Sequence, residues 1–303
     1  MLSVVIPAYN EEKMVSRASE VIASVLKEND IAYEIIFVND GSNDSTWNEI
    51  KTQTSQCENV KGISFSRNFG KEAAIFAGLS ECKGECAVVI DCDLQHPPQK
   101  IIEMYQLWKE GYEIIEGRKN SRGKENPFHG YAAKIFYKMI SNATGVDMQD
   151  ASDYRLMDRK VITALINMTE HDAFFRALSS WVGFKTKEVY YDVAEREAGE
   201  SKWSTKSLVK YAMINISSFT SFPLQVVTIL GIVMLIMSVV LSAETLIKWG
   251  MNKAVEGFTT VIIMQCFTGS ILMISLGIIG YYISKIYASV QNRPRYIISE
   301  RQG

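Results

Sequence analysis

Short apolar runs alternate with segments of mixed polarity from the first residue to Gly117, and this pattern predicts an α/β domain. The apolar runs have the length of strands, and in the segments between them apolar residues recur at helical spacing. Strands that alternate with helices are typical of a largely parallel sheet covered by helices on both faces. The five predicted strands span residues 2–6, 33–38, 60–65, 87–90 and 113–115.

Polar residues directly follow three of these predicted strands and indicate a ligand site. The tetrapeptide NDGS follows the second strand, Asp91 and Asp93 follow the fourth, and EGR follows the fifth. In open α/β sheets, ligands bind beyond the carboxyl ends of the strands. The turn after the first strand reads PAYNEE and lacks a GxGxxG fingerprint, which argues against a dinucleotide-dependent oxidoreductase.

The sharpest local signal is the pair Asp91 and Asp93 in the run DCDLQHPP. Two carboxylates in one extended turn suit Mg²⁺ or Mn²⁺, which bind one or two carboxylates together with substrate phosphates. Asp40 stands at an equivalent strand end, where its carboxylate is able to accept hydrogen bonds from a base or a ribose. Taken one at a time, the acidic pair is compatible with a solvated turn, and Asp40 with an ordinary turn cap.

The last third of the chain contains two long uncharged runs, which predict membrane-spanning helices at 222–243 and 258–283. A helix over the first run would be about 33 Å long, enough for a hydrocarbon core of about 30 Å. The second run ends in Tyr281 and Tyr282, a residue type enriched at membrane interfaces. The alternative is a buried hairpin in a soluble protein.

Basic residues beside these runs predict their orientation. Three lysines closely precede the first run, and four basic residues follow the second: Lys202, Lys206, Lys210, Lys285, Arg293, Arg295 and Arg301. The positive-inside rule then places both termini in the cytoplasm. Residues 204–221 carry apolar side chains at roughly helical spacing, which predicts an interfacial helix, with an ordinary packing helix as the alternative.

Composition narrows the function classes. The formal net charge of −2 gives no electrostatic reason to expect nucleic acid as a partner. The five cysteines are scattered and lack the paired spacing of a zinc site, so we interpret them as reduced thiols. The N-terminus enters an apolar run without a basic flank or a cleavage site, which predicts that no secretory signal is present and that the polar domain stays in the cytoplasm.

Four segments, VVIPAYNEE, FVNDGSNDST, SRNFGKEAAI and DCDLQHPP, resemble in order and spacing the family 2 glycosyltransferases of GT-A fold. Further segments, EGRK, ASDYRLMDR, FFRALSSWVGF and REAGESKWS, narrow the resemblance to the polyprenyl-phosphate branch, which includes dolichol-phosphate mannose synthases and GtrB-like enzymes. The resemblance covers essentially the whole chain, including a two-span C-terminal anchor. Processive polymer synthases are similar at the start, but the chain lacks their Gln-x-x-Arg-Trp motif.

On the donor side, the resemblance implies a nucleotide-sugar site that contains Asp40 near the base and a metal ion between Asp91 and Asp93. Arg118 would meet a phosphate, a role that suits its forked donors, unless it is an ordinary surface arginine. The full set of implied nucleotide-sugar ligands is Pro7, Tyr9, Glu11, Asp40, Asp91, Gln95 and Arg118.

On the acceptor side, the resemblance implies that Asp153 is the candidate general base and acts with Asp93, Arg196 and Lys202 in catalysis. The family commonly has Gly and Phe on either side of this aspartate, where the chain has Ser and Tyr, and it has Arg-Gly-Leu where the chain has Arg-Ala-Leu. The implied ligands of the acceptor phosphate are Arg176, Arg196, Ser201 and Lys202. Alternatively, Arg196 and Lys202 are simply positive-inside anchors.

The expected activity is inverting transfer of a hexose from a nucleotide sugar, UDP-glucose or UDP-N-acetylglucosamine, to undecaprenyl or another polyisoprenyl phosphate at the cytoplasmic face of the plasma membrane. The cofactor would be Mg²⁺ or Mn²⁺, and the GtrB-like resemblance implies a homotetramer. The alternatives are a membrane-tethered transferase for a glycan or protein acceptor and a sugar-nucleotide sensor without turnover. The predicted parts are a GT-A domain (1–203), an interfacial helix (204–221), a transmembrane hairpin (222–283) and a cytoplasmic tail (284–303).

Overall fold

The computed structural model describes residues 1–120, 151–168, 174–192, 222–251, 257–291 and 293–303. The chain divides into two compact units, one of residues 1–216 with 294–303 and one of residues 217–293. The interfacial helix predicted at 204–221 lies outside the described residues.

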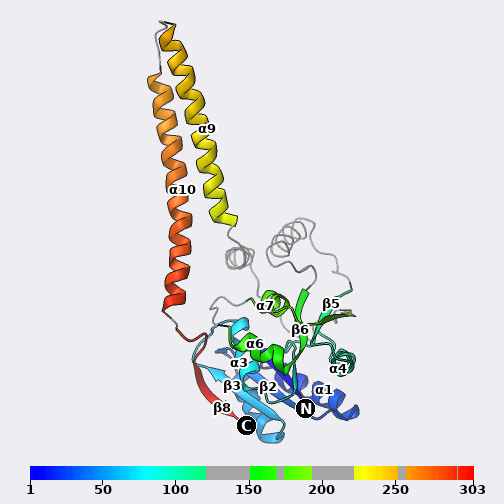
Figure 1. Ribbon diagram of the computed structural model, residues 1–303. Coiled ribbons are helices and arrows are strands. Elements are labelled where there is room, and N and C mark those ends of the chain that lie inside the picture. The colour runs from blue at the N-terminus through cyan, green and yellow to red at the C-terminus, as the bar shows by residue number, and fades with distance from the viewer. Residues whose placement is uncertain (121–150, 169–173, 193–221, 252–256, 292) are drawn as a thin grey trace. The chain divides into compact units, whose positions relative to one another are not determined.

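The first unit is built on a mixed sheet with the strand order β7-β5-β6-β4-β1-β2-β3-β8. Figure 1 labels several of these strands. The inner pairs β1 with β2, β1 with β4 and β2 with β3 are all parallel. Its strands are β1 (Leu2–Ala8), β2 (Tyr33–Asn39), β3 (Val60–Phe65), β4 (Cys86–Val89), β5 (Ile114–Lys119), β6 (Ala151–Asp158), β7 (Thr186–Tyr191) and β8 (Ile298–Gln302). The prediction of a mostly parallel α/β fold is confirmed, and all five predicted strands are present.

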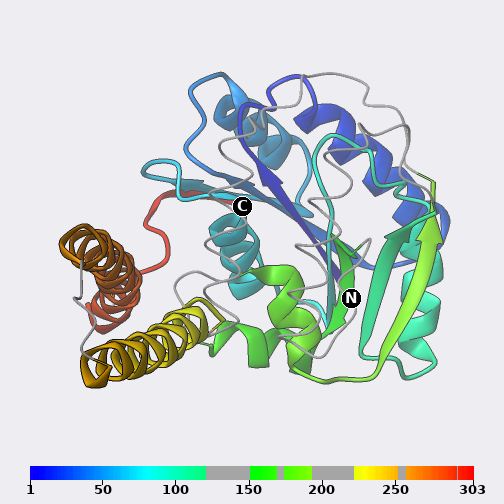
Figure 2. The ribbon, with the colours of Figure 1, turned by 90° about the horizontal axis from the view of Figure 1, so that it is seen from above.

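The central strands are buried along their whole length because helices cover both faces of the sheet. Every residue of β1, β2 and β4 is buried. Helix α1 packs against α2, whereas α3 packs against α6, and Figure 2 shows these two pairs on opposite sides of the sheet. The helices of this unit are α1 (Val15–Glu28), α2 (Thr46–Gln56), α3 (Lys71–Glu81), α4 (Lys100–Lys109), α6 (Arg159–Ile166) and α7 (Phe175–Trp181).

Helix α3 packs closely against β1 at Gly78. A Cβ at this position would stand 2.3 Å from Val5 Cγ1, a separation that no side chain tolerates. The buried face of the helix continues through Ala74 and Ala77, which also leave little bulk between helix and sheet. Small residues on α3 therefore fix its height above β1 and, with it, the position of its first residue, Lys71.

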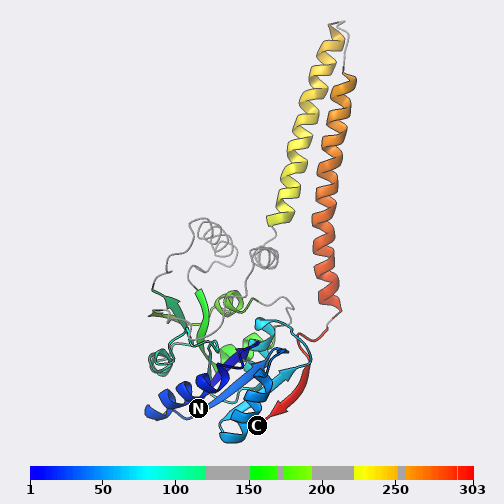
Figure 3. The ribbon, with the colours of Figure 1, turned by 180° about the vertical axis from the view of Figure 1, so that it is seen from behind.

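The second unit is a pair of long apolar helices, α9 (Phe222–Gly250) and α10 (Phe258–Val290), which lie side by side in Figures 1 and 3. Leu224–Thr245 and Phe267–Val290 are long and apolar enough to cross a membrane, with mean hydropathies of 2.7 and 1.6. Almost none of the residues in these windows are buried by the protein itself. The alternative of a buried soluble hairpin therefore receives no support from the packing.

The segment predicted as a cytoplasmic tail (284–303) contains the end of a helix and an edge strand, and its cytoplasmic location stays a prediction. Helix α10 continues past the last apolar run to Val290, and residues 298–302 then form β8, which pairs antiparallel with β3 (Figure 3). Tyr296 stacks on Phe65 with ring centroids 5.1 Å apart, and the Glu300 carboxylate accepts a hydrogen bond from the Trp47 indole. The sequence ISERQ is too short and too polar to predict a strand. Strand β8 forms because it pairs with the otherwise open edge of β3.

Candidate active site

The carboxyl ends of the parallel strands meet at one edge of the sheet, and the predicted donor-side residues gather there. Pro7 is in β1 and is followed by Tyr9 and Glu11, while Asp40 directly follows β2. The Glu11 amide donates to Thr46 Oγ1 at 2.8 Å, which ties the turn after β1 to the start of α2. The structure thus brings these four residues together as the sequence predicted, although their contact with a nucleotide stays a prediction.

Asp153 lies at the same edge although it is near the start of its strand, because β6 is antiparallel to its neighbours β4 and β5. Strand β4 pairs antiparallel with β6, with Cys86 opposite Asp158 and Val89 opposite Arg155. Continuing the ladder by two residues on each chain brings Asp91, beyond the end of β4, opposite Asp153 near the start of β6. The register therefore places the proposed acceptor-side carboxylate beside the proposed metal ligand.

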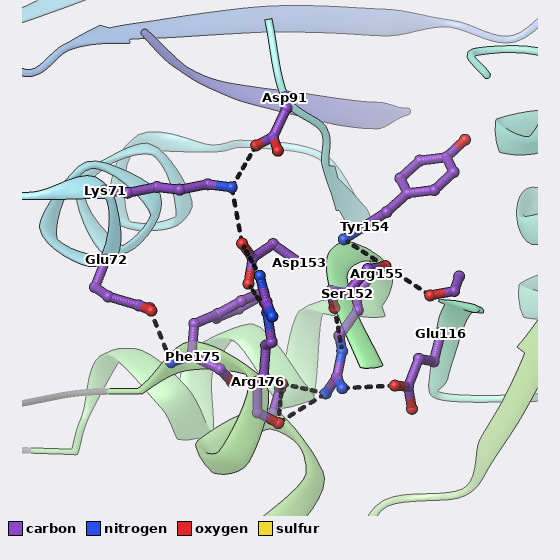
Figure 4. A network of polar contacts seen from close by, with 12 residues as sticks. Lys71, Glu72, Asp91, Glu116, Ser152, Asp153, Tyr154, Arg155, Phe175 and Arg176 are labelled. Atoms are coloured by element: carbon purple, nitrogen blue, oxygen red, sulfur yellow. Dashed lines mark hydrogen bonds and ion pairs between the residues drawn. The ribbon is translucent and has the colours of Figure 1, made fainter. Parts of the chain in front are cut away.

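The Lys71 ammonium bridges these two carboxylates, as Figure 4 shows. Its Nζ lies 2.6 Å from Asp91 Oδ1 and 2.8 Å from Asp153 Oδ2. Burial raises the pKa of Asp91, but neighbouring groups, the Lys71 ammonium foremost among them, bring the pKa below its usual range. Both carboxylates are therefore ionised at neutral pH and share one cation.

Arg176, in the first turn of α7, makes a second and stronger contact with Asp153. Its Nε and one terminal nitrogen donate to the two carboxylate oxygens at 2.7 and 3.0 Å, a bidentate arrangement. Burial raises the pKa of Asp153, but Arg176 and Lys71 together hold it well below its usual range. In this arrangement Asp153 is a weak proton acceptor. The structure places the predicted acceptor-side residues Arg176 and Asp153 in contact, and the predicted binding of the acceptor phosphate by Arg176 stays a prediction.

Helix α7 is held in position by Arg155, a completely buried arginine on β6. Its guanidinium donates to the carbonyl of Arg176 at 3.1 Å, to Ser180 Oγ at 2.9 Å and to Ser179 Oγ. The remaining terminal nitrogen meets Glu116 of β5 at 2.9 Å. A buried charge is tolerated only when it is paired and fully hydrogen-bonded, so this network locks β5, β6 and α7 together.

Glu72 fixes α7 at its other end. Its Oε2 accepts the amide of Phe175, the first residue of α7, at 2.8 Å. Burial, together with the nearby Asp153 charge, raises the pKa of Glu72 to about 7. Consecutive residues at the start of α3 thus act on Asp153 by two routes, Lys71 directly and Glu72 through the helix that carries Arg176.

Asp40 holds the loop that precedes Lys71. Its carboxylate accepts the amides of Phe69 at 2.7 Å and Gly70 at 3.0 Å. Gly41, with φ of 62°, lies so close to this loop that a Cβ would stand 2.3 Å from the carbonyl carbon of Arg67. Asp40 therefore has a clear structural role, and its predicted contact with a base would be an additional one.

Asp93, Gln95 and His96 line the turn after β4. Asp93 Oδ1 accepts the Gln95 amide at 3.1 Å, which directs the turn. The His96 ring is buried, stacks on Tyr154 and places Nδ1 3.9 Å from Asp91 Oδ2. Within the described residues this nitrogen has no hydrogen-bond partner. Burial lowers the pKa of His96, so the ring is neutral at pH 7.

Arg118 lies at the end of β5, opposite the first residue of β6, and so belongs to the same edge. Its guanidinium pairs with Glu188 at 3.0 Å and stands 3.8 Å from Glu116. Its predicted contact with a donor phosphate stays a prediction. The predicted acceptor-phosphate ligands Arg196, Ser201 and Lys202 lie outside the described residues.

Comparison with known proteins identifies the family. Residues 3–165 match the family described as Glycosyl transferase family 2. The chain belongs to the family 2 glycosyltransferases. It is 38% identical over 307 residues to an uncharacterized glycosyltransferase, YkcC, of Bacillus subtilis (strain 168), which covers 99% of this chain and 94% of that protein. It is 33% identical over 301 residues to the bactoprenol glucosyl transferase of Shigella phage SfII, covering 99% and 97%.

A solved structure agrees with the fold of this glycosyltransferase. Mannosyl-3-phosphoglycerate synthase from Rubrobacter xylanophilus superposes with a TM-score of 0.50 at 15% identity and covers 72% of each chain. The predicted GT-A fold is confirmed, and so is the predicted resemblance to the polyprenyl-phosphate branch, through the bactoprenol glucosyl transferases.

Three residues of the candidate site had no role in the sequence interpretation: Lys71, Glu72 and Arg155. Lys71 and Glu72 are part of the segment SRNFGKEAAI that carried the family resemblance. Their position just after β3, at the start of a helix on the ligand edge, was an available signal. Nothing in the sequence predicted Arg155, because an arginine in a strand normally indicates an exposed position.

We expect Arg155→Met to lower the free energy of unfolding by about 3–5 kcal/mol, since it leaves Glu116 charged and buried without its main partner. Thermal unfolding of the purified protein in detergent measures the loss. The double variant R155M/E116Q should recover part of it. The control is Arg301→Met, whose pair with Glu81 is largely exposed and should cost less than about 1 kcal/mol. Equal losses in the two single variants would contradict the assignment.

We expect Glu72→Gln to change how stability depends on pH. The pKa of Glu72 is raised from 4.5 to about 7, so the folded state binds this proton more tightly than the unfolded state. The stabilisation is complete below pH 4.5 and is lost as the pH rises through 7. The melting temperature of the wild type, relative to E72Q, should therefore fall between pH 5 and pH 8. Parallel pH profiles would show that Glu72 titrates normally.

Proposed function

We propose that this protein transfers a hexose from a nucleotide sugar to a polyisoprenyl phosphate at the membrane surface. The observation that carries the proposal is the placement of Asp91 beside Asp153 in a family 2 glycosyltransferase, with a cation between them. Its relatives named bactoprenol glucosyl transferase match over nearly their full length, which supports a lipid phosphate as acceptor and favours glucose over N-acetylglucosamine.

The donor side has the chemistry to hold a divalent ion. Asp91 is ionised and part-exposed, and Asp93 stands two residues further along the same turn. Mg²⁺ and Mn²⁺ prefer such oxygen ligands and take the remainder from water and substrate phosphates, so the pair fits an ion bridged to a nucleoside diphosphate. When bound, the ion would neutralise charge that develops on the leaving diphosphate. Gln95 and Arg118 would border the same group.

The acceptor side is arranged to orient an anion rather than to remove a proton. A phosphate monoester has its second pKa near 6, so a polyisoprenyl phosphate is already largely dianionic at neutral pH. Asp153 is a weak base because Arg176 and Lys71 hold its pKa low. We therefore assign Asp153 the task of holding Arg176 in position for the acceptor phosphate, together with Arg196 and Lys202.

The second unit suits a lipid acceptor. Two apolar helices whose surfaces the protein leaves uncovered would cross the bilayer, with the catalytic unit and both termini in the cytoplasm, as the basic residues predict. The sugar-carrying lipid would then form where the nucleotide sugar is available. The homotetramer implied by the GtrB-like resemblance stays a prediction.

The first test is a transfer assay with the purified full chain in detergent, undecaprenyl phosphate and radiolabelled sugar nucleotides. We expect label in the lipid from UDP-glucose with Mg²⁺ or Mn²⁺, and none with EDTA. Asp91→Ala should lower the rate on the order of a hundredfold or more, since it removes charge stabilisation of the leaving group. Glu103→Ala, at an exposed carboxylate of α4, is the matched control.

The same assay separates the alternative functions. Free sugars or glycans offered in competition should leave the labelling of undecaprenyl phosphate unchanged. Labelling of the glycan instead of the lipid would show that the hairpin is only a tether. Nucleotide binding without transfer to any acceptor would indicate a sensor.

The product should carry an inverted anomeric centre. The acceptor phosphate is an anionic nucleophile by itself, so one displacement at the anomeric carbon of an α-linked sugar nucleotide gives a β-linked lipid phosphate. Proton coupling at the anomeric carbon of the purified lipid, measured by NMR, determines the configuration. An α-linked product would require a second displacement and would rule out this mechanism.

A further inference from the structure

Lys71 occupies the place where the two substrates of the proposed reaction must meet. It lies between Asp91, on the donor side, and Asp153, on the acceptor side, at 2.6 and 2.8 Å. Its side chain is 39% exposed, compared with 6% for that of Asp153, so incoming groups can reach the ammonium more easily than the carboxylate behind it. The bond that breaks and the bond that forms both lie between these two sides.

The backbone of Lys71 is fixed while its side chain is able to move. Asp40 accepts the amides of Phe69 and Gly70, and Gly70, with φ of 99°, turns the chain into α3. Gly78 holds the same helix against β1. A lysine side chain is a flexible stem with a compact charge that carries three donors, so it can exchange partners without movement of the helix.

Donor binding would remove one of the two partners of Lys71. A divalent ion held by Asp91 would compete with the Lys71 ammonium for the same carboxylate, and the two cations would repel each other. Asp153 does not depend on Lys71, because Arg176 still donates to both of its oxygens. The ammonium is then free to turn to the anions nearest to it, which in the proposed reaction are phosphate oxygens.

We propose that Lys71 binds a phosphate oxygen during transfer and that Asp91 and Asp153 hold its ammonium in place until the substrates arrive. This inference rests on the proposed function. The phosphate belongs either to the leaving nucleoside diphosphate or to the lipid acceptor, and both present the same chemistry to the ammonium. In the first case Lys71 stabilises the leaving group, and in the second it aligns the nucleophile.

The test compares Lys71→Met and Lys71→Arg with the wild type, all as the full chain in detergent. Lys100→Met is the matched control, because Lys100 forms an ion pair with Glu103 on the exposed face of α4. Calorimetry with Mn²⁺ present measures the affinity for UDP and for uridine, which lacks the diphosphate. Steady-state transfer measures kcat and the KM for undecaprenyl phosphate.

If the partner is the leaving diphosphate, K71M weakens UDP binding roughly tenfold to hundredfold, the range for one charge-assisted hydrogen bond, and leaves uridine binding unchanged. If the partner is the lipid, UDP binding is retained and the KM for undecaprenyl phosphate rises by a similar factor. K71R, which keeps the charge, recovers part of either loss, and K100M matches the wild type.

Two results would overturn the inference. One is unchanged UDP affinity, kcat and lipid KM in K71M. The other is an equal loss of UDP and uridine binding in K71M that K71R does not relieve, which would indicate a purely structural lysine. Should K71M fail to fold, Lys71→Gln keeps a hydrogen-bond donor toward Asp153 and carries the same comparison. Failure of the proposed function itself looks different, because the wild type would then transfer no sugar to the lipid.

Discussion

Strand β6 runs antiparallel between β4 and β5, and the geometry of the site depends on this reversal. In a purely parallel sheet, only residues that follow strands reach the ligand edge. The antiparallel ladder from Cys86 and Asp158 to Val89 and Arg155 brings the beginning of β6 to that edge as well. Asp153 therefore faces Asp91, although the two residues are 62 positions apart in the chain.

Asp91 and Asp153 are two neighbouring ionised carboxylates, which repel each other unless cations lie beside them. Two different helices supply these cations. Lys71 comes from the start of α3, and Arg176 from the start of α7. Each helix is positioned by a buried contact: Gly78 lets α3 approach β1, and Arg155 binds the carbonyl of Arg176. The pKa of Asp153 is low because Lys71 and Arg176 lie beside its carboxylate, and the contacts that position these two residues are made elsewhere, at Gly78 and Arg155.

In the proposed reaction, the same arrangement would let one edge of the sheet serve two substrates of like charge. A nucleotide sugar and a lipid phosphate are both anionic, so they repel each other unless cations lie between them. Arg176 and Lys71 provide positive charge beside Asp153, and the pair Asp91 and Asp93 would provide a place for a divalent ion. Charge separation of this kind would bring the two anions within reach of each other without the need for a strong base.

The sequence by itself determined the fold class, the first five strands, the two long apolar helices and the pair Asp91 and Asp93 beyond β4. These features are local: apolar period, run length and short motifs at strand ends are written in neighbouring residues. Only the tertiary structure decided that β6 is antiparallel, that residues 298–302 complete the sheet, and that Lys71, Glu72 and Arg155 organise the site. Strand direction, edge pairing and the partners of a buried charge depend on residues far apart in the chain, and no local pattern records them.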